Sequence, residues 1–307
     1  MLTLLALFAC STPEAPVAPA EPALIRVRLA LNWYPEPEFG GFYEGVLGGI
    51  YKEAGFDVEL IPGGPGAPTL SLLGTGAAEA AITAADDLLL ARNRGIKAIG
   101  VWPAFQVSPI GLMVHPETGV TGFHGIKSGR VAMEIGGPFQ LFLAHAYNLD
   151  KQVELVPTTG AVASWLADPT LIQQGYITAE PCALQIKGEA VRFLRAADAG
   201  WNPYGTLVAL PEPLPGWASA FVHATATAWS AYAADPTRAN AEIGRLNDQM
   251  DAELLPCIAA AQAPYLSGDD GMGAMTKARW DALNEGLIAI GLLDAGATAD
   301  SAWANVP

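Results

Sequence analysis

Three glutamates stand where a carboxylate could hold a small polar ligand. Glu36 and Glu38 lie in a proline-rich loop after the apolar segment Ile25 to Leu31, and Glu180 follows another segment of strand character. A carboxylate at a strand end accepts hydrogen bonds from an amine, or from the amino edge of a polar ring, more strongly than a neutral side chain does. The alternative for Glu180 is an ordinary surface or hinge carboxylate, and we expect one of Glu36 and Glu38 to be only solvated.

Aromatic side chains recur at the expected strand ends, where they could stack on a flat heterocycle. Each stacked aromatic pair contributes about 0.5 to 1.5 kcal/mol beyond its buried area. Core packing is the alternative for any single one of them. The aromatic residues that we expect to contact a ligand are Trp33, Phe39, Tyr43, Phe139, Tyr176 and Tyr204.

Four further residues could add polar contacts. Thr83 and Asp86 stand where a strand is expected to end and a helix to begin, and an Asp there is equally a helix cap. Gln106 could both donate and accept hydrogen bonds toward a polar ring. Gly136 belongs to a Gly-Gly-Pro turn before a helix, whose free backbone N–H groups could hold a phosphate or carboxylate, although a plain turn is the alternative.

Alternating strands and helices position these residues, which predicts an α/β protein with parallel sheets. A strand over 25–31, a helix over 42–54 and a strand over 58–61 form the first unit. Pro35 turns the chain outward at the carboxyl end of the first strand, where open α/β sheets bind ligands. A second set begins at residue 131, and later helices are expected over 215–234, 236–246, 251–261 and 274–290.

The chain is expected to cross twice between two Rossmann-like lobes, near 108–114 and near 204–208. Two crossings make a two-strand hinge, and the space between the lobes is the expected binding site. We assign residues 24–110 and 207–307 to lobe I and residues 111–206 to lobe II.

Composition narrows the possible functions. The 307 residues carry 31 acidic and 16 basic side chains, and a net charge of −15 disfavours nucleic acid and anionic membrane surfaces as partners. The four histidines have no metal-ligand spacing, and neither a Gly-x-Ser-x-Gly elbow nor a P-loop occurs. We therefore expect no metal, no cofactor and no catalytic residue.

The first residues predict an export signal. Residues 1–10 are mostly apolar and end in a Leu-Phe-Ala-Cys pattern similar to a lipobox, in which Cys10 would be lipidated, and residues 11–23 form a Pro/Ala-rich tether. The protein would then be periplasmic or held at the cell envelope by its lipid anchor alone; the alternative is an apolar artefact at a start codon. Cys182 and Cys257 permit one disulfide in such an oxidising compartment, or two buried thiols.

A first block of motif residues comprises Leu31, Trp33, Pro35, Gly41, Tyr43, Gly55, Phe56, Asp57 and Val58, and the segments 72–95, 104–114 and 173–181 follow it. These motifs resemble the NMT1/THI5-like family of periplasmic binding proteins. The resemblance implies a type II periplasmic binding protein, or Venus-flytrap, fold. It also implies a solute-binding lipoprotein that delivers a small heteroaromatic ligand to an ABC permease and its ATPase.

The resemblance leaves the ligand open. A thiamine-precursor pyrimidine is the first expectation, riboflavin the second, and a sulfonate or nitrate the third. The family also has an enzymatic branch, a fungal pyrimidine synthase that uses pyridoxal phosphate, with a His in the first loop, a nearby Lys and a Cys-rich motif. Here Phe39 stands in place of that His and both other features are missing, with Lys52 the nearest lysine, so we expect a binding protein without catalysis. A sensor or scaffold that has lost its transporter is a further alternative.

Overall fold

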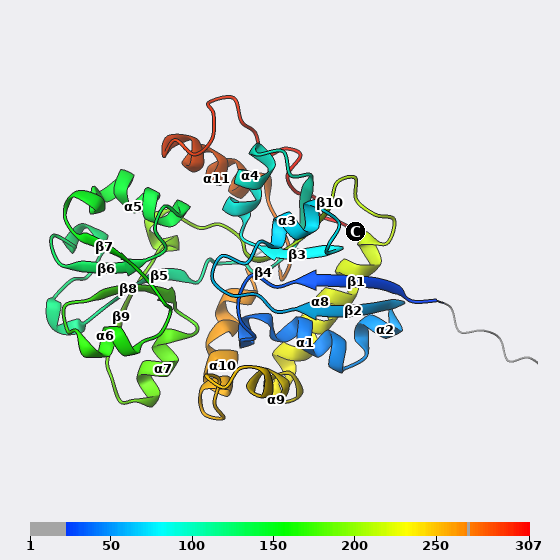
Figure 1. Cartoon of the computed structure of the whole chain (residues 1–307), viewed down its shortest axis with the longest axis horizontal. Helices are drawn as coiled ribbons and strands as arrows, with labels where there is room; N and C mark the ends of the chain where they lie inside the picture. The colour runs from blue at the N-terminus through cyan, green and yellow to red at the C-terminus, as the bar shows by residue number, and fades with distance from the viewer. Residues whose placement is uncertain (1–22, 269–270) are drawn as a thin grey trace, which may run out of the picture.

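The chain folds into two α/β lobes, each built around one five-stranded sheet. The computed structural model describes residues 23–268 and 271–307, so Cys10 and the tether 11–22 lie outside the described residues. Figure 1 shows lobe I and lobe II side by side, with the chain crossing between them near the middle. This arrangement confirms the predicted α/β class with two lobes, but both sheets are mixed and not parallel as predicted, because β10 and β5 run antiparallel to their neighbours.

The sheet of lobe I has the strand order β2-β1-β3-β10-β4. The parallel strands β2, β1 and β3 form one side, and β10 runs antiparallel to both β3 and β4. The return of a late strand to the first sheet was expected from the sequence. The bounds are β1 (Ile25–Ala30), β2 (Phe56–Ile61), β3 (Ala80–Thr83), β4 (Ala98–Phe105) and β10 (Gly205–Pro211).

The sheet of lobe II repeats this plan with the order β7-β6-β8-β5-β9. Strands β7, β6 and β8 are parallel, whereas β5 is antiparallel to β8 and β9. The bounds are β5 (Ile110–Val114), β6 (Arg130–Met133), β7 (Glu154–Pro157), β8 (Ile172–Tyr176) and β9 (Arg192–Arg195). The carboxyl ends of β6 and β8 are followed by segments that face lobe I.

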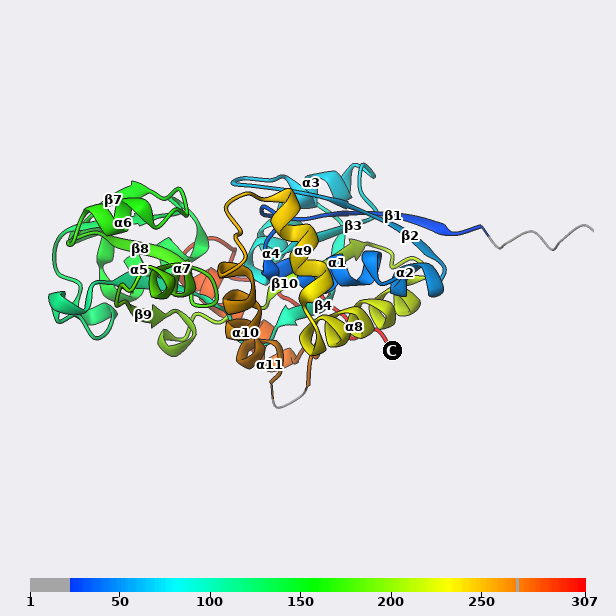
Figure 2. The ribbon, with the colours of Figure 1, turned by 90° about the horizontal axis from the view of Figure 1, so that it is seen from below.

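Helices cover the faces of both sheets (Figures 1 and 2). In lobe I they are α1 (Gly40–Leu47), α2 (Ile50–Glu53), α3 (Thr69–Gly74), α4 (Ala85–Asn93), α8 (Ala218–Ala234), α9 (Thr237–Leu246), α10 (Leu254–Leu266) and α11 (Lys277–Ala289). In lobe II they are α5 (Pro138–Tyr147), α6 (Ala163–Ala167) and α7 (Glu180–Ile186). The 3-10 turns are η1 (Pro37–Phe39), η2 (Pro116–Thr118), η3 (Phe123–Gly125), η4 (Leu149–Lys151) and η5 (Ala197–Ala199).

The predicted helix 42–54 is in fact two helices. Gly49 adopts a left-handed conformation with φ of 75°, which ends α1 and lets α2 begin at Ile50. A left-handed residue cannot continue a right-handed helix, and glycine adopts it without a steric penalty. The sequence prediction missed this break because the apolar spacing continues across it.

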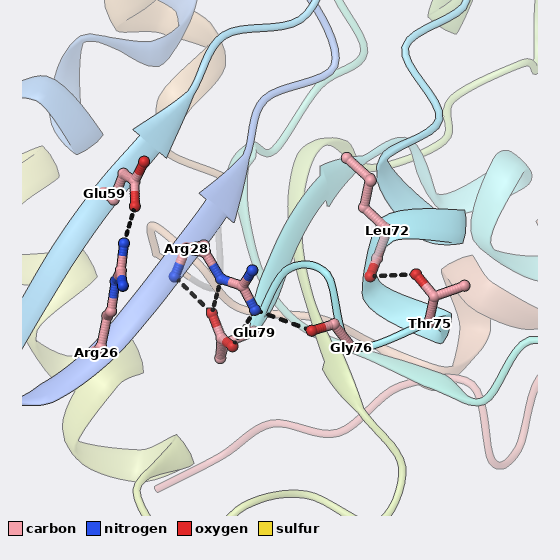
Figure 3. Close-up of polar contacts among 7 residues, drawn as sticks. All are labelled: Arg26, Arg28, Glu59, Leu72, Thr75, Gly76 and Glu79. Carbon is pink, nitrogen blue, oxygen red and sulfur yellow. Dashed lines mark hydrogen bonds and ion pairs between the residues drawn. The ribbon is translucent and has the colours of Figure 1, made fainter.

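Two arginines of β1 tie the edge of the first sheet together on its solvent side (Figure 3). The guanidinium of Arg28 donates to both carboxylate oxygens of Glu79, at 3.0 and 2.7 Å, and to the carbonyl oxygen of Gly76 at 2.9 Å. Arg26 pairs with Glu59 of β2 at 2.8 Å. The Arg26 pair is largely exposed and contributes little, whereas the bidentate Arg28 contact holds the turn before β3 against β1.

Arg279 of α11 forms hydrogen bonds with both chain crossings of the hinge. The sheets are connected by residues 106–109 and 196–204, and Arg279 donates to the carbonyl oxygens of Gln106, Asn202 and Pro203. Its guanidinium also lies 3.7 Å from the ring centroid of Tyr204. Burial lowers the pKa of Arg279 to about 10, which still leaves it charged at neutral pH. This residue therefore fixes the hinge strands to lobe I.

Glycines allow α1 to lie directly on α8. A methyl group at Gly41 would come within 2.2 Å of the Trp229 ring, and one at Gly40 within 2.1 Å of the Tyr232 ring. Gly40 and Gly41 directly follow the loop that contains Glu38, so the close packing of α1 on α8 also fixes the position of Glu38. Small residues are needed here because any Cβ would overlap a buried aromatic ring.

We expect Gly41→Ala to destabilise the protein by about 1 to 3 kcal/mol, because the added methyl overpacks the contact with Trp229. Urea unfolding followed by circular dichroism would measure the change. Val46→Ala is the matched control, since Val46 is exposed on the same helix. A loss below about 0.5 kcal/mol for Gly41→Ala would contradict the assigned packing.

Candidate ligand site between the lobes

The strand ends of the two lobes face each other and make contact, and we call this region the interlobe junction. The hydroxyl of Thr178, in lobe II, donates to Oε1 of Glu38, in lobe I, at 2.7 Å. On another part of the junction, a methyl group at Gly160 of lobe II would lie 3.6 Å from Cζ2 of Trp33. The loop after β1 therefore meets lobe II through one aromatic ring and one carboxylate.

Glu38 is the most deeply buried carboxylate of the junction. Only 3% of it is exposed, and its second oxygen, Oε2, has no hydrogen-bond partner among the described residues. Burial raises the pKa of Glu38, and the hydrogen bond from Thr178 opposes that rise. A buried carboxylate oxygen without a donor is costly, so it marks a place where a ligand donor would be favourable.

Glu180 folds back under the end of its own strand. Its Oε2 accepts a hydrogen bond of 2.7 Å from the backbone N–H of Tyr176. Gly175 makes this possible, because a Cβ there would lie 2.7 Å from Cδ of Glu180. Burial raises the pKa of Glu180 to about 7.

Glu36 completes a group of three carboxylates from both lobes. Its pKa is raised well above the ordinary value, first by burial and then by the negative charges of Glu38 and Glu180. A polar contact with the Trp33 side chain opposes this rise. The hydrogen bond between Glu38 and Thr178 brings the loop of Glu36 and Glu38 next to the Glu180 segment, so the three carboxylates that were predicted separately from the sequence belong to the same part of the junction.

A second acidic group comes from α4. Asp86 and Asp87 lie in the first turn of that helix, whereas the N-cap position itself is occupied by Ala84, so neither aspartate is the cap considered from the sequence. Burial and the neighbouring charge of Asp87 raise the pKa of Asp86 to about 8. Asp87 is exposed on one side, but desolvation by the surrounding protein and the charge of Glu134 of lobe II raise its pKa to about 6, whereas the charge of Arg94 opposes this rise.

Tyr176 lies between the two acidic groups. It is the last residue of β8 and lies close to Glu180, whose carboxylate accepts a hydrogen bond from the Tyr176 backbone N–H. The pKa of Tyr176 is raised first by burial and then by the charges of Glu38, Asp86, Asp87 and Glu180. The phenol therefore stays protonated and keeps its O–H as a donor and its ring as an apolar surface.

The junction has a strong excess of negative charge. Its six acidic residues are Glu36, Glu38, Asp86, Asp87, Glu134 and Glu180. Within residues 23–268 and 271–307, no Lys, Arg or His lies within 4.0 Å of a carboxylate oxygen of any of them. The same part of the chain has no group of three or more His, Cys, Asp or Glu side chains arranged to hold a metal ion. The arrangement suits an organic ligand that donates hydrogen bonds, and it disfavours an anion.

Several predicted ligand residues lie instead in packed regions. Phe39, Phe139 and Tyr204 are each less than 5% exposed, and the first two belong to hydrophobic cores. The hydroxyl of Tyr204 accepts a hydrogen bond from the backbone N–H of Thr276, and Arg279 covers its ring. Because their surfaces already have partners, we leave these three out of the proposed ligand contacts.

The remaining predicted residues have mixed surroundings. The Tyr43 hydroxyl is buried without a partner among the described residues, and burial raises its pKa to about 12. Thr83 donates to the carbonyl oxygen of Ala84 at 3.2 Å. Gln106 lies at the hinge, where its backbone N–H donates a hydrogen bond to the carbonyl oxygen of Tyr265 at 2.7 Å.

The Gly-Gly-Pro turn is not a free anion site. The N–H of Gly136 donates to Oε1 of Gln140 at 3.1 Å, so the donor expected for a phosphate or carboxylate is already occupied. Gly136 has φ of 77°, which identifies the plain βα turn considered as the alternative.

Sequence reasoning missed Thr178, Gly160 and Glu134 as parts of the junction. Thr178 stands only two residues before Glu180, so its position after β8 was an available signal. Gly160 and Glu134 carry no local signal, because their importance depends on which residue faces them across the junction.

Two cavities lie in lobe I. One of about 290 Å³ is lined by residues that include Trp102, Val222, Gly273 and Asn305, and one of about 490 Å³ by residues that include Glu44, Asp235 and Arg238. None of the predicted ligand residues lines either cavity.

The raised carboxyl pKa values predict that acid stabilises the ligand-free junction. A carboxyl group that binds its proton more tightly when folded contributes stability below its unfolded pKa, and this contribution is lost as the pH rises through the folded value. For Asp86, with a folded pKa of about 8, the window extends from about pH 4 to pH 8. We expect the wild type to lose about 2 kcal/mol of unfolding free energy between pH 6 and 8 from this group.

Denaturation of the wild type and Asp86→Asn at pH 6 and 8 would measure this effect. The variant should lose less stability across the interval, and Asp57→Asn on the exposed face of β2 should behave as the wild type. If the wild type and Asp86→Asn lost the same unfolding free energy between pH 6 and 8, Asp86 would not be the group responsible for the pH dependence.

Comparison with known proteins identifies the family. The model of the family described as NMT1/THI5 like matches residues 36–239, about two-thirds of the chain, including the loop with Glu36 and Glu38 and the Glu180 segment. The chain belongs to the NMT1/THI5-like family. The family match and the named relatives place it with solute-binding proteins of the ABC import type and not with the enzymatic branch of the family.

Two relatives of this NMT1/THI5-like chain are named for the ligands that they bind. The riboflavin-binding protein RibY of Chloroflexus aurantiacus is 25% identical over 345 residues, which cover 99% of this chain and 95% of the relative. The formylaminopyrimidine-binding protein of Halalkalibacterium halodurans is 25% identical over 218 residues, which cover 68% of this chain and 64% of the relative.

Solved structures share the fold of this NMT1/THI5-like protein. The alkanesulfonate-binding protein SsuA of Xanthomonas axonopodis pv. citri aligns with a TM-score of 0.68 at 12% identity, covering 93% of this chain and 99% of that one. A Candida albicans protein with the generic periplasmic binding protein fold aligns with a TM-score of 0.63 at 13% identity, covering 92% and 98%. Among the helices that the structure describes, none is long and apolar enough to cross a membrane.

Proposed function

We propose that this protein captures a flat heteroaromatic compound with hydrogen-bond donors on one edge, in particular an aminopyrimidine precursor of thiamine, at the interlobe junction. The observation that carries the proposal is the group of Glu36, Glu38 and Glu180, which brings three carboxylates from two lobes together without a cation within 4.0 Å. Exocyclic amino groups and a protonated ring nitrogen would supply the missing donors.

Aromatic rings would hold the plane of the ligand. Trp33 is partly exposed at the end of β1 and Tyr176 is partly exposed at the end of β8, so each lobe offers one ring. Stacking on both faces would add about 0.5 to 1.5 kcal/mol for each ring beyond the area that is buried. Tyr43, Thr83, Asp86 and Gln106 are proposed as outer contacts around this central group.

Binding would favour the closed arrangement of the lobes. A ligand that contacts carboxylates of both lobes interacts better with the closed form than with the open form, so it shifts the population toward closure. The closed protein would then present the ligand to an ABC permease with its ATPase. Lipidation of Cys10 would hold the protein at the cell envelope while it does so.

Riboflavin is the second candidate ligand, because the match to the RibY relative extends over 99% of this chain. Its larger flat ring would use the same two aromatic side chains but would depend less on a carboxylate group. A sulfonate or nitrate is disfavoured, because it would meet six acidic side chains, and among the described residues no Lys, Arg or His lies within 4.0 Å of their carboxylate oxygens.

Mass spectrometry of small molecules released from the purified, denatured protein would test this proposal. We expect a flat nitrogen heterocycle at close to one molecule per chain. A sulfonate or another anion in that ratio would overturn the proposed ligand class, and a flavin would favour the second candidate.

A further inference from the structure

We propose that the disulfide between Cys182 and Cys257 is a clasp across the interlobe junction, which keeps one edge of the ligand site assembled and restricts how the lobes open. The sulfur atoms are bonded, and the two Cα atoms are 5.9 Å apart, which settles the choice between a disulfide and two thiols. Cys182 belongs to α7 of lobe II, whereas Cys257 belongs to α10 of lobe I. The inference concerns the motion of the site proposed above and uses the two-lobed fold, not the identity of the ligand.

Helix α10 extends from the hinge to the disulfide. Near its end, the carbonyl oxygen of Tyr265 accepts hydrogen bonds from the N–H groups of Gln106 and Val107, at 2.7 and 3.3 Å, in the first hinge crossing. Cys257 precedes Tyr265 by eight residues, which is about 12 Å along a helix axis. Figures 1 and 2 both show α7 beside α10, so the disulfide joins neighbouring helices.

This position limits rotation about the hinge. A disulfide keeps its Cα atoms between about 4.4 and 6.8 Å apart, so the present separation leaves about 1 Å of additional extension. At a lever arm of about 12 Å, that extension permits roughly 5° of rotation that would separate α7 from α10. The disulfide does not limit rotation about the line of α10, because the contact of α10 with the first hinge crossing and the disulfide both lie on that line.

The clasp therefore divides the ligand site into a fixed edge and a mobile edge. On the fixed edge, Gln262 of α10 donates to the carbonyl oxygen of Pro37 at 3.1 Å, which holds the loop of Glu38 against α10. Thr178 and Glu180 precede Cys182 by four and two residues. Both partners of the Glu38 to Thr178 hydrogen bond are thus tied to the disulfide, and the carboxylate group stays assembled without ligand.

The mobile edge lies away from α10. It contains the contact of Trp33 with Gly160 and the approach of Glu134 to Asp87, neither of which is linked covalently across the junction. Opening about α10 would separate these groups and admit the ligand there. The protein then meets its ligand with half of the site already formed, which lowers the ordering cost of binding.

Distance measurements between spin labels on the ligand-free full chain would test the clasp. Labels would be attached through non-natural amino acids, so that the native cysteines stay unchanged. The fixed-edge pair replaces Ile186 of α7 and Ala260 of α10, and the mobile-edge pair replaces Tyr34 and Ile135; all four positions are exposed. In the oxidised protein we expect a narrow distance distribution for the first pair and a broad one for the second.

Reduction by a phosphine provides the matched comparison. The phosphine is oxidised to its oxide, water supplies the oxygen and two protons, and the disulfide becomes two thiols, which thiol titration would count. We expect the fixed-edge distribution to broaden at least about twofold, and the double variant Cys182→Ser/Cys257→Ser to show the same breadth with or without phosphine.

An unchanged fixed-edge distribution after complete reduction would overturn the clasp, as would equally broad distributions for both pairs in the oxidised protein. Far-ultraviolet circular dichroism would establish that the variant is folded. Because no ligand is present, either outcome leaves the proposed ligand class to its own test.

Discussion

Trp33→Ala should weaken the binding of formylaminopyrimidine and of riboflavin by about thirtyfold or more, which corresponds to about 2 kcal/mol. Trp33 is the partly exposed ring at the end of β1, and it lies against Gly160 of the other lobe. Its loss would remove both a stacking surface for the ligand and a contact that favours closure. Isothermal titration at one pH and salt concentration would measure the change.

The control for this substitution is its exposed neighbour. Tyr34 contacts Trp33 edge to face, with ring centroids 5.5 Å apart, and is 45% exposed. We expect Tyr34→Ala to change affinity less than threefold or so, while the unfolding transitions of both variants stay close to that of the wild type. Collapse of the ligand-free fold in Trp33→Ala would instead make Trp33 a structural residue.

Glu180→Gln should weaken an aminopyrimidine by about thirtyfold or more and weaken riboflavin much less. The substitution keeps an oxygen that can accept the hydrogen bond from the N–H of Tyr176, so the local fold is retained. What is lost is the negative charge opposite the amino edge of the ligand. A charged hydrogen bond that is shielded from water is the strongest single contact that the junction offers.

Glu189→Gln is the matched control for Glu180→Gln, because Glu189 is an exposed glutamate of the same lobe. It should leave both affinities unchanged. Equal losses for the aminopyrimidine and for riboflavin in Glu180→Gln would remove Glu180 from any specific role in distinguishing them.

Local sequence patterns predicted the architecture well because each lobe is built from short strand and helix units. The apolar segments that became β1 and β10 and the helix 236–246, observed as α9, needed only local information. The helix expected over 251–261 begins and ends later, as α10 (Leu254–Leu266), because Pro264 lies inside it instead of ending it. The break at Gly49 was missed for a related reason, since its backbone conformation is not encoded in apolar spacing.

The site was less predictable because it is assembled across long sequence separations. The Glu38 to Thr178 hydrogen bond joins residues 140 positions apart, and the disulfide joins residues 75 positions apart. Residue type selected Glu36, Glu38 and Glu180 as neighbours of strand ends, but the expectation that one of Glu36 and Glu38 is only solvated is wrong, because burial raises the pKa of both. Residue type also could not separate the partly exposed Tyr176 from the buried Tyr204. Only the packing of α11 shows that Tyr204 is already covered by Arg279.

The central claim is that the acidic interlobe junction binds a donor-rich aromatic ring, and isothermal titration of ligand-free protein with formylaminopyrimidine tests it most directly. An alkanesulfonate titrated under the same conditions is the comparison. We predict saturable binding of the pyrimidine at one molecule per chain and no measurable heat from the sulfonate. Saturable binding of the sulfonate, with none of the pyrimidine or of riboflavin, would contradict the account.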